Sequence, residues 1–439
     1  MTTNVLLIGS GGREHAIAWK LRQSAGLGEL VVAPGNAGIA LIAECVPLAV
    51  PSAHAPADEV AAYGTAVVAL ARERRADLVV VAPDDPLAFG LVDMVQAAGI
   101  RAFGPTKAAA RIESSKAFAK DLMRRHGIPM GESAQFDDFE AARAYVEARP
   151  CDVVVKADGL FVGKGTVVPA SRAEAVEVLR SMLVEGEMGA AGRTVVIEDK
   201  LVGRETSAHA FSDGKHVAHM PFSCDHKPVF DGNRGPNTGG MGVYSPPGWL
   251  AESTAEQVRR DVTEAAVRAM ASEGTPFAGV LYPGLFVTDD GPRVIEFNAR
   301  FGDPECECLL PLLESDLLAI MRACCDGTLD RADVRWSAQA SVTVMLASGG
   351  YPGPYEKGKV IQGLEAVDAD VVVFHAGTKL DDAGRFVTNG GRVLGVTALG
   401  ETMEAARAKA YANVERIHFE GMHYRRDIGA SAEVLGSRL

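Results

Sequence analysis

The chain has 439 residues, 47% of them hydrophobic and 23% charged, and this length predicts roughly two to four domains. Its formal net charge of -13 argues against nucleic acid or a membrane surface as a partner, because either polyanion would be repelled. No segment reaches the ~18 apolar residues that a membrane-spanning helix needs, and no secretory pattern begins the chain. We therefore expect a cytoplasmic protein, a monomer or weak homo-oligomer, that acts on small molecules. Its seven cysteines form no C-x-x-C pair, so reduced structural thiols are expected.

Apolar runs that end in turns alternate with helical patterns over residues 1–124. The runs are NVLLIG, LVVAPGNAG, DLVVVAPDDP and IRAFGP. Alternation of this kind predicts a doubly wound parallel sheet, with ligands at the carboxyl ends of its strands. We expect these residues to form an N-terminal α/β domain.

Three further units are predicted after this domain. Residues 125–192 indicate a small α/β unit with helices over 137–148 and 172–183 around the strand DVVVKA. Residues 193–330 indicate a more antiparallel body, with a helix over roughly 253–272 and a hairpin that turns at Asp289–Gly291. Residues 331–439 form a C-terminal unit with a closing helix over 401–417 and the apolar runs SVTVMLAS, KVIQGL, VVVFHAGT and GGRVLGVTALG.

A glycine-rich turn follows the first predicted strand. Its sequence, Gly9-Ser10-Gly11-Gly12-Arg13-Glu14, nearly matches the dinucleotide-binding pattern, but the sixth residue is Glu rather than Gly. The second strand also ends in Ala-Pro-Gly instead of an acid that could hold a ribose hydroxyl. Two interpretations remain: a phosphate at the helix N-terminus with Arg13 or His15 nearby, or a plain structural turn.

A second glycine-rich loop spans Gly159–Gly165. It is not a P-loop, because only three residues separate Gly159 from Gly163, and Gly165 stands where a hydroxyl residue would bind magnesium. Its Gly-Lys-Gly tip can still fold over phosphates, since glycine lets backbone N–H groups approach closely. Lys156 on the preceding strand would add a positive charge. The alternative is a solvated loop.

The stretch VIEFNARF, residues 294–301, predicts a strand with charged groups on one face. Alternation places three residues toward the core: Ile295, Phe297 and Ala299. The opposite face then carries Glu296, Asn298 and Arg300. Carboxylate and amide oxygens suit Mg²⁺, which also binds substrate phosphates. The guanidinium could hold a carboxylate or the acyl phosphate made from it, or could simply pair with Glu296.

The stretch GPNTGGMGVYSP, residues 235–246, contains four glycines and small polar groups. This composition favours a loop that lies close to a substrate, although a tight turn without function would look the same.

Taken together, these motifs resemble the ATP-grasp superfamily, and within it the glycinamide ribonucleotide synthetases (phosphoribosylamine–glycine ligases). The matching segments span nearly the whole chain: GSGGREHA, APGNAG, FGPT, SKAFAKD, KADGL, GKG, DHK, GPNTGGMG, IEFN, RFGDPE, GGYPG, FHAGT and TNGGRV. The resemblance implies an α/β ATP-grasp fold with a doubly wound N-terminal domain, a small ATP lid and a C-terminal α+β domain. It also implies ATP and Mg²⁺ (or Mn²⁺), and a purine-biosynthesis reaction in which glycine is activated as an acyl phosphate and joined to phosphoribosylamine.

The resemblance further assigns roles to individual residues. The implied ATP-binding residues are Lys116, Lys156, Gly163, Lys164, Gly165, Glu198, Asp199, Leu201 and Glu205. The implied metal ligands are Glu296 and Asn298, and the implied catalytic residues are Arg300, Asp225 and Lys164. The residues implied to border the amino acid and the amine are Gly9, Gly11, Gly12, Asn36, Gly239, Gly240 and Arg300.

Several positions depart from the family pattern. Glu-Ala has become Asp84-Asp85, a small pair has become Phe161-Val162, and three further changes introduce Cys224, Pro228 and Glu307. These changes leave a second reading open, an ATP-grasp ligase that joins a different acid and amine. A non-catalytic nucleotide-binding protein and a nicotinamide-dependent dehydrogenase are the remaining alternatives. The retained metal ligands argue against the first, and the incomplete dinucleotide-binding pattern argues against the second.

Overall fold

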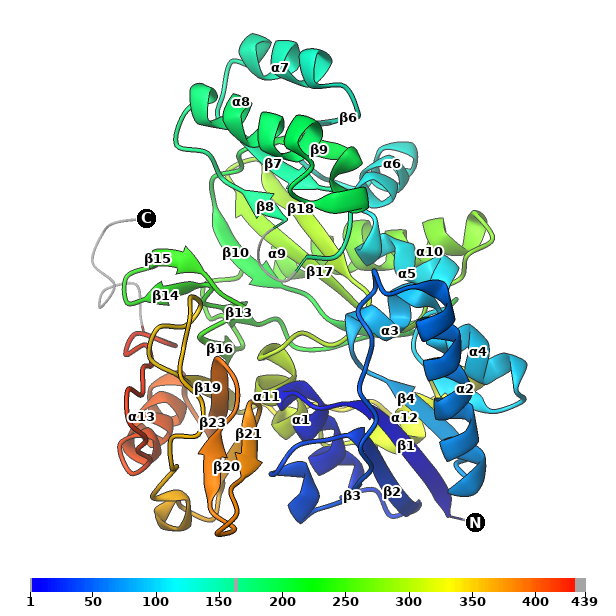
Figure 1. Ribbon diagram of the computed structural model, residues 1–439, viewed down its shortest axis with the longest axis vertical. Helices are drawn as coiled ribbons and strands as arrows, with labels where there is room; N and C mark the ends of the chain where they lie inside the picture. The colour runs from blue at the N-terminus through cyan, green and yellow to red at the C-terminus, as the bar shows by residue number, and fades with distance from the viewer. Residues whose placement is uncertain (1, 162–164, 431–439) are drawn as a thin grey trace.

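The structure is a computed structural model that describes residues 2–161 and 165–430. Figure 1 shows the N-terminal unit (blue) and the C-terminal unit (orange to red) side by side, with a small helical and sheet unit at the far end of the molecule. The body lies between these three parts. Within the described ranges, every helix is too short or too polar to cross a membrane.

The N-terminal sheet is parallel with the strand order β3-β2-β1-β4-β5, so the predicted doubly wound sheet is confirmed. The order reverses between β1 and β4, which places the loops after these two strands at one crevice. One loop contains Gly9–Gly12, and the other leads to Asp84. The strands are β1 (Thr3–Gly9), β2 (Leu27–Pro34), β3 (Glu44–Cys45), β4 (Leu78–Val81) and β5 (Arg101–Phe103). The helices are α1 (Gly12–Leu21), α2 (Ala57–Glu73), α3 (Asp84–Phe89), α4 (Leu91–Ala97) and α5 (Lys107–Ser114).

The small unit, called the lid below, is a four-stranded sheet in the order β6-β9-β7-β8 with antiparallel neighbours. Two helices pack on it through an apolar core that includes Val146, Leu179 and Ile197. Both helices were expected, although the second ends in a π turn over Ser181–Glu185. The lid elements are β6 (Ser133–Phe136), α7 (Phe139–Ala148), β7 (Val153–Ala157), β8 (Thr166–Val167), α8 (Arg172–Arg180) and β9 (Val195–Asp199), preceded by α6 (Lys116–His126).

The body is built on a sheet in the order β10-β17-β11-β12, with β18 added to β17. The predicted hairpin is confirmed, because Thr288 pairs with Gly291 at its turn. The predicted long helix is present as α9 and α10, joined by a π turn over Arg259–Glu264. The elements are β10 (Arg204–Ser207), β11 (Ala210–Asp213), β12 (Val217–His219), α9 (Glu252–Val258), α10 (Ala265–Ser272), β17 (Ala278–Thr288) and β18 (Gly291–Asn298).

A β-bulge in β18 changes which side chains face the core. Gly284 of β17 pairs with Glu296, but the next residue, Leu285, pairs with Val294, so Ile295 is the extra residue. Phe297 lies in the core, as predicted. Ile295, in contrast, is half-buried and lines the cavities described below, so its predicted core position is wrong. Sequence alternation alone does not reveal a bulge, because the extra residue resets the period.

The C-terminal unit shares a sheet with the body. The sheet order is β13-β16-β19-β23-β20, and its first two strands come from residues 224–245. The apolar run KVIQGL makes two isolated bridges, from Val360 and Gln362. The boundaries at 124, 192 and 330 stay predictions. The elements are β13 (Cys224–Asp225), β14 (Pro228–Phe230), β15 (Arg234–Asn237), β16 (Gly242–Ser245), α11 (Glu305–Leu309), α12 (Leu317–Asp326), β19 (Ala340–Ala347), β20 (Val371–His375), β21 (Thr378–Leu380), β22 (Phe386–Thr388), β23 (Arg392–Gly400) and α13 (Met403–Val414).

Candidate active site

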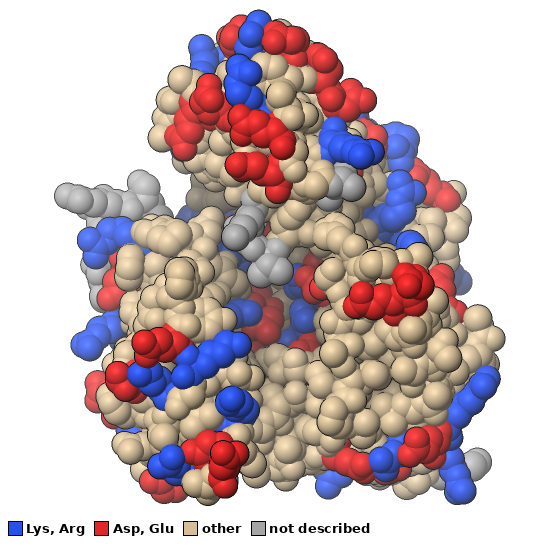
Figure 2. All heavy atoms as spheres, in the orientation of Figure 1, with Lys and Arg blue, Asp and Glu red and all other residues tan. Residues whose placement is uncertain are grey.

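Two adjoining cavities lie where the lid, the body and the N-terminal unit meet. The larger, of about 1290 Å³, lies between the lid sheet and the body, and the smaller, of about 250 Å³, lies over β18. Figure 2 shows the hollow at the centre of the molecular face, with acidic and basic atoms inside it. Six residues line both cavities: Lys116, Phe161, Glu198, Lys227, Ile295 and Glu296. Two reactants bound in the two cavities would therefore meet beside these residues.

A buried charge cluster forms the edge between lid and body. The Glu198 carboxylate lies 2.7 Å from Lys120 Nζ and 2.8 Å from Lys156 Nζ, and both lysines also donate to the carbonyl of Ile295. Burial works to raise the pKa of Glu198, but the two lysines outweigh it and hold this pKa below its usual value. Burial lowers the pKa of Lys120 to about 8. The predicted ATP residues Lys156 and Glu198 are thus brought together, and Lys120 joins them.

The glycine-rich loop of the lid is partly described. Gly163 and Lys164, both predicted to hold phosphates, lie outside the described residues, while Gly165 lines the larger cavity. Lys116 lines both cavities and donates from Nζ to the carbonyl of Gly159 at 2.7 Å. This lysine therefore stands at the base of the loop, where the resemblance places a phosphate.

The remaining predicted ATP residues lie along the larger cavity. Asp199, Leu201 and Glu205 all line it, and Asp199 forms a two-bond ion pair with Arg149. Burial raises the pKa of Glu205 to about 7, despite the opposing charge of Lys227. Three of the departures from the family pattern line this larger cavity: Phe161, Cys224 and Pro228. Of these, only Phe161 also lines the smaller one.

Glu296 and Asn298 offer oxygen atoms to the smaller cavity. Within the described residues Glu296 has no ion pair, which leaves its carboxylate available. Asn298 Oδ1 accepts one hydrogen bond, from Arg300 at 3.2 Å, and an amide oxygen has a second lone pair. An available carboxylate and an amide oxygen, with lysines close by, fit the ligands and the phosphates that Mg²⁺ requires.

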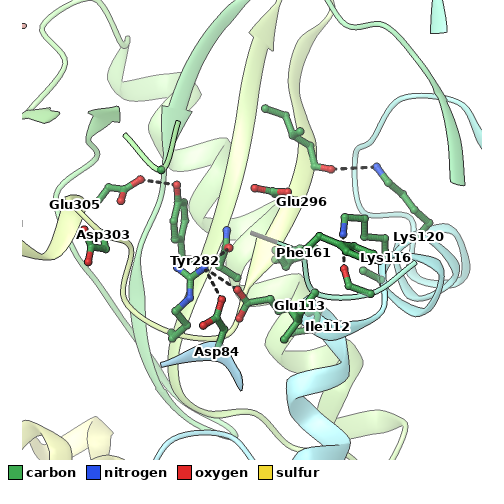
Figure 3. A pocket seen from close by; sticks show the side chains of 18 of the residues that line it. Asp84, Ile112, Glu113, Lys116, Lys120, Phe161, Tyr282, Glu296, Asp303 and Glu305 are labelled. Atoms are coloured by element: carbon green, nitrogen blue, oxygen red, sulfur yellow. Dashed lines mark hydrogen bonds and ion pairs between the residues drawn. The ribbon is translucent and has the colours of Figure 1, made fainter. Parts of the chain in front are cut away.

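Arg300 pairs with residues other than Glu296. Its Nη2 lies 2.9 Å from Glu113 and 3.8 Å from Asp84, as the converging dashed lines in Figure 3 show. Glu113 also accepts from the N–H of Ala299, so α5 and β18 are held together at this point. The Nε of Arg300 has no hydrogen-bond partner among the described residues. The guanidinium lines the smaller cavity, where its positive charge can attract an anionic ligand.

Asp225 and Lys227 form a second pair beside the cavities. Lys227 Nζ donates to Asp225 Oδ2 at 2.6 Å. Burial raises the pKa of Asp225 to about 6, although Lys227 opposes the shift. Gly240 packs on this carboxylate with a φ of +117°, and a β-carbon there would lie 2.6 Å from Asp225 Oδ1. Only glycine fits this position, and Gly239 beside it lines the smaller cavity.

The N-terminal glycine loop is engaged by the protein's own carboxylates. The N–H of Gly11 donates to Glu14 Oε2 at 2.6 Å, and the N–H of Arg13 donates to Asp303 Oδ2 at 3.4 Å. Gly9–Gly12 and Asn36 are not among the described residues that line the two cavities. The amide of Asn36 donates to the carbonyls of Ser10 and His375.

The phosphate interpretation of this loop stays a prediction, and the two side chains named with it, Arg13 and His15, have partners within the protein. Arg13 is buried against Glu14 at 2.7 Å, and His15 Nδ1 accepts from the N–H of His375. Burial lowers the pKa of His15 to about 3, so this side chain is neutral. The roles predicted for Gly9, Gly11, Gly12 and Asn36 toward the amine stay predictions.

Sequence reasoning missed several residues that shape the smaller cavity. Arg392 of β23 donates to the carbonyls of Gly239 and Asp303, both at 2.7 Å, and lies 2.9 Å from Asp303 Oδ1. Tyr282 donates from its hydroxyl to Glu305 at 2.6 Å. Lys120 and Arg392 lie in two of the segments that resemble the family, SKAFAKD and TNGGRV. The resemblance was therefore the one signal in the sequence that pointed to them.

Comparison with known proteins supports this site as that of one enzyme family. The N, ATP-grasp (A) and C domains of phosphoribosylglycinamide synthetase match residues 3–113, 114–306 and 341–431. The chain is 47% identical over 430 residues to phosphoribosylamine–glycine ligase of Mesorhizobium japonicum, covering 98% of both chains. It is 46% identical to the ligase of the same name from Halalkalibacterium halodurans, covering 98% of this chain and 97% of that one.

Solved structures agree with this assignment. The crystal structure of phosphoribosylamine–glycine ligase from Thermotoga maritima superimposes with a TM-score of 0.82 at 32% identity, covering 97% of this chain and 100% of that one. A biotin carboxylase domain from Hydrogenobacter thermophilus, at 16% identity and a TM-score of 0.72 over 97% and 92% of the chains, shares the fold. The chain belongs to the phosphoribosylglycinamide synthetase family of ATP-grasp ligases.

Proposed function

We propose that this chain joins glycine to 5-phosphoribosylamine at the expense of ATP, giving glycinamide ribonucleotide, ADP and phosphate in purine biosynthesis. The observation that carries the proposal is the pair of cavities with a shared wall of charged residues. ATP fits the larger cavity, with its phosphates directed toward Lys116 and Lys156, and the amino acid fits the smaller one beside Arg300. The full-length similarity to phosphoribosylamine–glycine ligases supports these substrates.

In the first step a carboxylate oxygen of glycine attacks the γ-phosphorus, and the bond from that phosphorus to ADP breaks. Arg300 and Lys227 orient the carboxylate, while Lys116 and Lys156 offset the charge of the phosphate oxygens. Glu296 and Asn298 would hold Mg²⁺ (or Mn²⁺), which supplies further neutralisation of phosphate charge when bound. Positioning and charge stabilisation of this kind are the main demands of phosphoryl transfer.

In the second step the amine nitrogen attacks the carbonyl carbon of the acyl phosphate, and phosphate leaves. The amine must lose a proton as the C–N bond forms. Asp225, whose pKa is raised to about 6, is a suitable acceptor. The lid would exclude water from the acyl phosphate, with Lys164 as the predicted contact at its tip.

The test is ADP release with Mg-ATP, glycine and freshly made phosphoribosylamine, with other amino acids and amines run in parallel. Turnover that requires both purine substrates would establish the proposal. Turnover only with another acid or amine would overturn it, and would favour the second reading, in which Phe161, Cys224, Pro228 and Glu307 mark a changed substrate. A cytoplasmic location and a monomeric or weakly associated state are proposed with it and need separate measurements.

A further inference from the structure

The smaller cavity contains many carboxylates, although carboxylates repel the phosphate groups that are proposed to react beside it. Six of them line it: Asp84, Glu113, Glu198, Glu296, Asp303 and Glu305. Four are committed to partners at close range. Glu113 pairs with Arg300, Glu198 with two lysines, Asp303 with Arg392, and Glu305 with the hydroxyl of Tyr282.

Among the described residues, only Glu296 and Asp84 lack such a partner in this group. Glu296 is already accounted for as a metal ligand. Asp84 has a side chain that is 42% exposed, and its nearest cation is Arg300 at 3.8 Å, beyond hydrogen-bond range. Its other contact is local, the N–H of Asp85 donating to Oδ1 at 3.2 Å. Figure 3 shows Asp84 below Glu113, both directed at the same guanidinium.

Asp84 is charged in this setting. Burial opposes ionisation, but Arg300 and Arg13 outweigh it and keep the pKa of Asp84 below its usual value. Its carboxylate therefore attracts a second cation, and the lining residues Lys116, Lys120 and Lys227 already have partners of their own. The Asp84 carboxylate and the Arg300 guanidinium, 3.8 Å apart and both lining the smaller cavity, match the two charges of a zwitterion.

We propose that Asp84 binds the ammonium group of the amino acid whose carboxylate Arg300 holds. The inference rests on the proposed function, because it assigns a binding residue to the ammonium group of glycine. That group takes no part in the phosphoryl transfer. A free α-amino acid presents an ammonium one carbon away from its carboxylate, so a single small molecule can reach both groups. Asp84 would thus select amino acids over carboxylic acids that lack an amine.

The first experiment replaces Asp84 by Asn, which keeps the size and the acceptor for Asp85 N–H but removes the charge. The variant Asp84→Asn should raise the KM for glycine by about tenfold or more, while the KM for ATP stays within about twofold. Glycolate, which carries a hydroxyl in place of the ammonium, should inhibit both forms equally well. Loss of glycolate inhibition in the variant, or an unchanged KM for glycine, would overturn the proposal.

Two further variants separate charge from structure. Asp85→Asn alters the neighbouring carboxylate, which lines neither cavity, and should leave the KM for glycine unchanged. Asp84→Glu restores the charge and should recover most of the glycine affinity. A Glu variant as poor as the Asn variant, with ATP affinity also lost, would show that Asp84 acts only through the fold of α3.

A binding measurement distinguishes failure of this inference from failure of the proposed function. The wild-type protein is melted with Mg²⁺, a non-hydrolysable ATP analogue and increasing glycine. A glycine-dependent rise in Tm that Asp84→Asn abolishes would support ammonium binding even if phosphoribosylamine were not the co-substrate. A rise of equal size in both forms would overturn the inference while leaving the ligase reaction intact.

Discussion

Two regions of this protein carry a sequence signature of phosphate binding, a glycine turn before a helix and a strand with metal ligands, and they differ in how far the protein itself engages their polar groups. In the loop Gly9–Gly12 the N–H of Gly11 donates to Glu14 and the adjacent N–H of Arg13 donates to Asp303. Along β18, in contrast, the Glu296 carboxylate has no ion pair among the described residues. A glycine turn before a helix offers donors to any anion, including the protein's own side chains. A ligand along β18 therefore finds polar groups already available, whereas a ligand at Gly9–Gly12 would have to replace the contacts with Glu14 and Asp303.

The substitution Glu296→Gln should have the largest effect and is the strongest test of this comparison. If this carboxylate serves a metal ion, its loss should lower kcat by about a thousandfold, because phosphate charge is no longer offset in the transition state. The Tm should change little, since the side chain has no described ion pair to lose. ADP formation over a range of Mg²⁺ and Mn²⁺ concentrations measures the effect, with Glu365→Gln on the exposed surface as control. Activity near wild type would refute the metal assignment.

The charged residues beside β18 that already form ion pairs should behave differently from Glu296. Replacing them should lower the stability of the protein more than its catalytic rate. Lys120→Met leaves Glu198 with a single lysine in a site where both partners are at most 4% exposed. Breaking a buried ion pair strands a charge, so the free energy of unfolding should fall by about 2–3 kcal/mol. Urea denaturation measures the loss, and Lys409→Met, which removes an exposed pair with Asp370, should cost far less. Equal losses in the two variants would contradict a cooperative buried cluster.

The sequence predicted the fold class well, because local patterns carry that information. Hydrophobic alternation located the parallel sheet, the lid helices and the β17–β18 hairpin. It failed at Ile295, where a bulge shifts the register. Lys120 and Arg392 were missed since their partners lie 78 and up to 153 residues away, and pairing at such a distance leaves no local pattern.

The C-terminal unit sharpens the comparison, because two of its side chains contact Gly239 beside the smaller cavity: the Tyr351 hydroxyl accepts from the N–H of Gly239 at 3.1 Å, and Arg392 donates to its carbonyl. Arg392 holds Gly239 and Asp303 with a planar fork of donors, and a lysine cannot bond both carbonyls and the carboxylate in that plane. Arg392→Lys should therefore raise the KM for the amino acid or the amine about tenfold and spare the KM for ATP. Steady-state kinetics with each substrate varied in turn measures the change in each KM. Arg385→Lys, at an exposed ion pair of the same unit, is the control, and an equal change in ATP affinity would argue against local positioning.

Glu307 extends the comparison to a carboxylate behind the glycine loop. The side chain is fully buried, neither oxygen has a hydrogen-bond partner among the described residues, and Oε1 lies 2.2 Å from where a β-carbon on Gly12 would stand. Burial, reinforced by the charge of Asp303, raises the pKa of Glu307 well above its usual value. The folded state therefore binds a proton that the unfolded chain has released, over the range between the ordinary and the raised pKa. In that range the free energy of unfolding falls as pH rises.

Glu307→Gln, which introduces the residue expected from the family pattern, removes this proton linkage. The variant should be more stable than the wild type by about 1 kcal/mol or more at pH 8, since the wild-type carboxylate must take up a proton on folding at that pH and the amide need not. The advantage should shrink toward pH 5, where the unfolded chain also begins to retain its proton. Urea denaturation at the two pH values measures the difference, and Glu420→Gln at an exposed position should show no such trend. A stability gain that does not grow with pH would mean that Glu307 is ionised in the folded protein. It would then have to be stabilised by Arg392 or Arg13 in the way that Asp303 is.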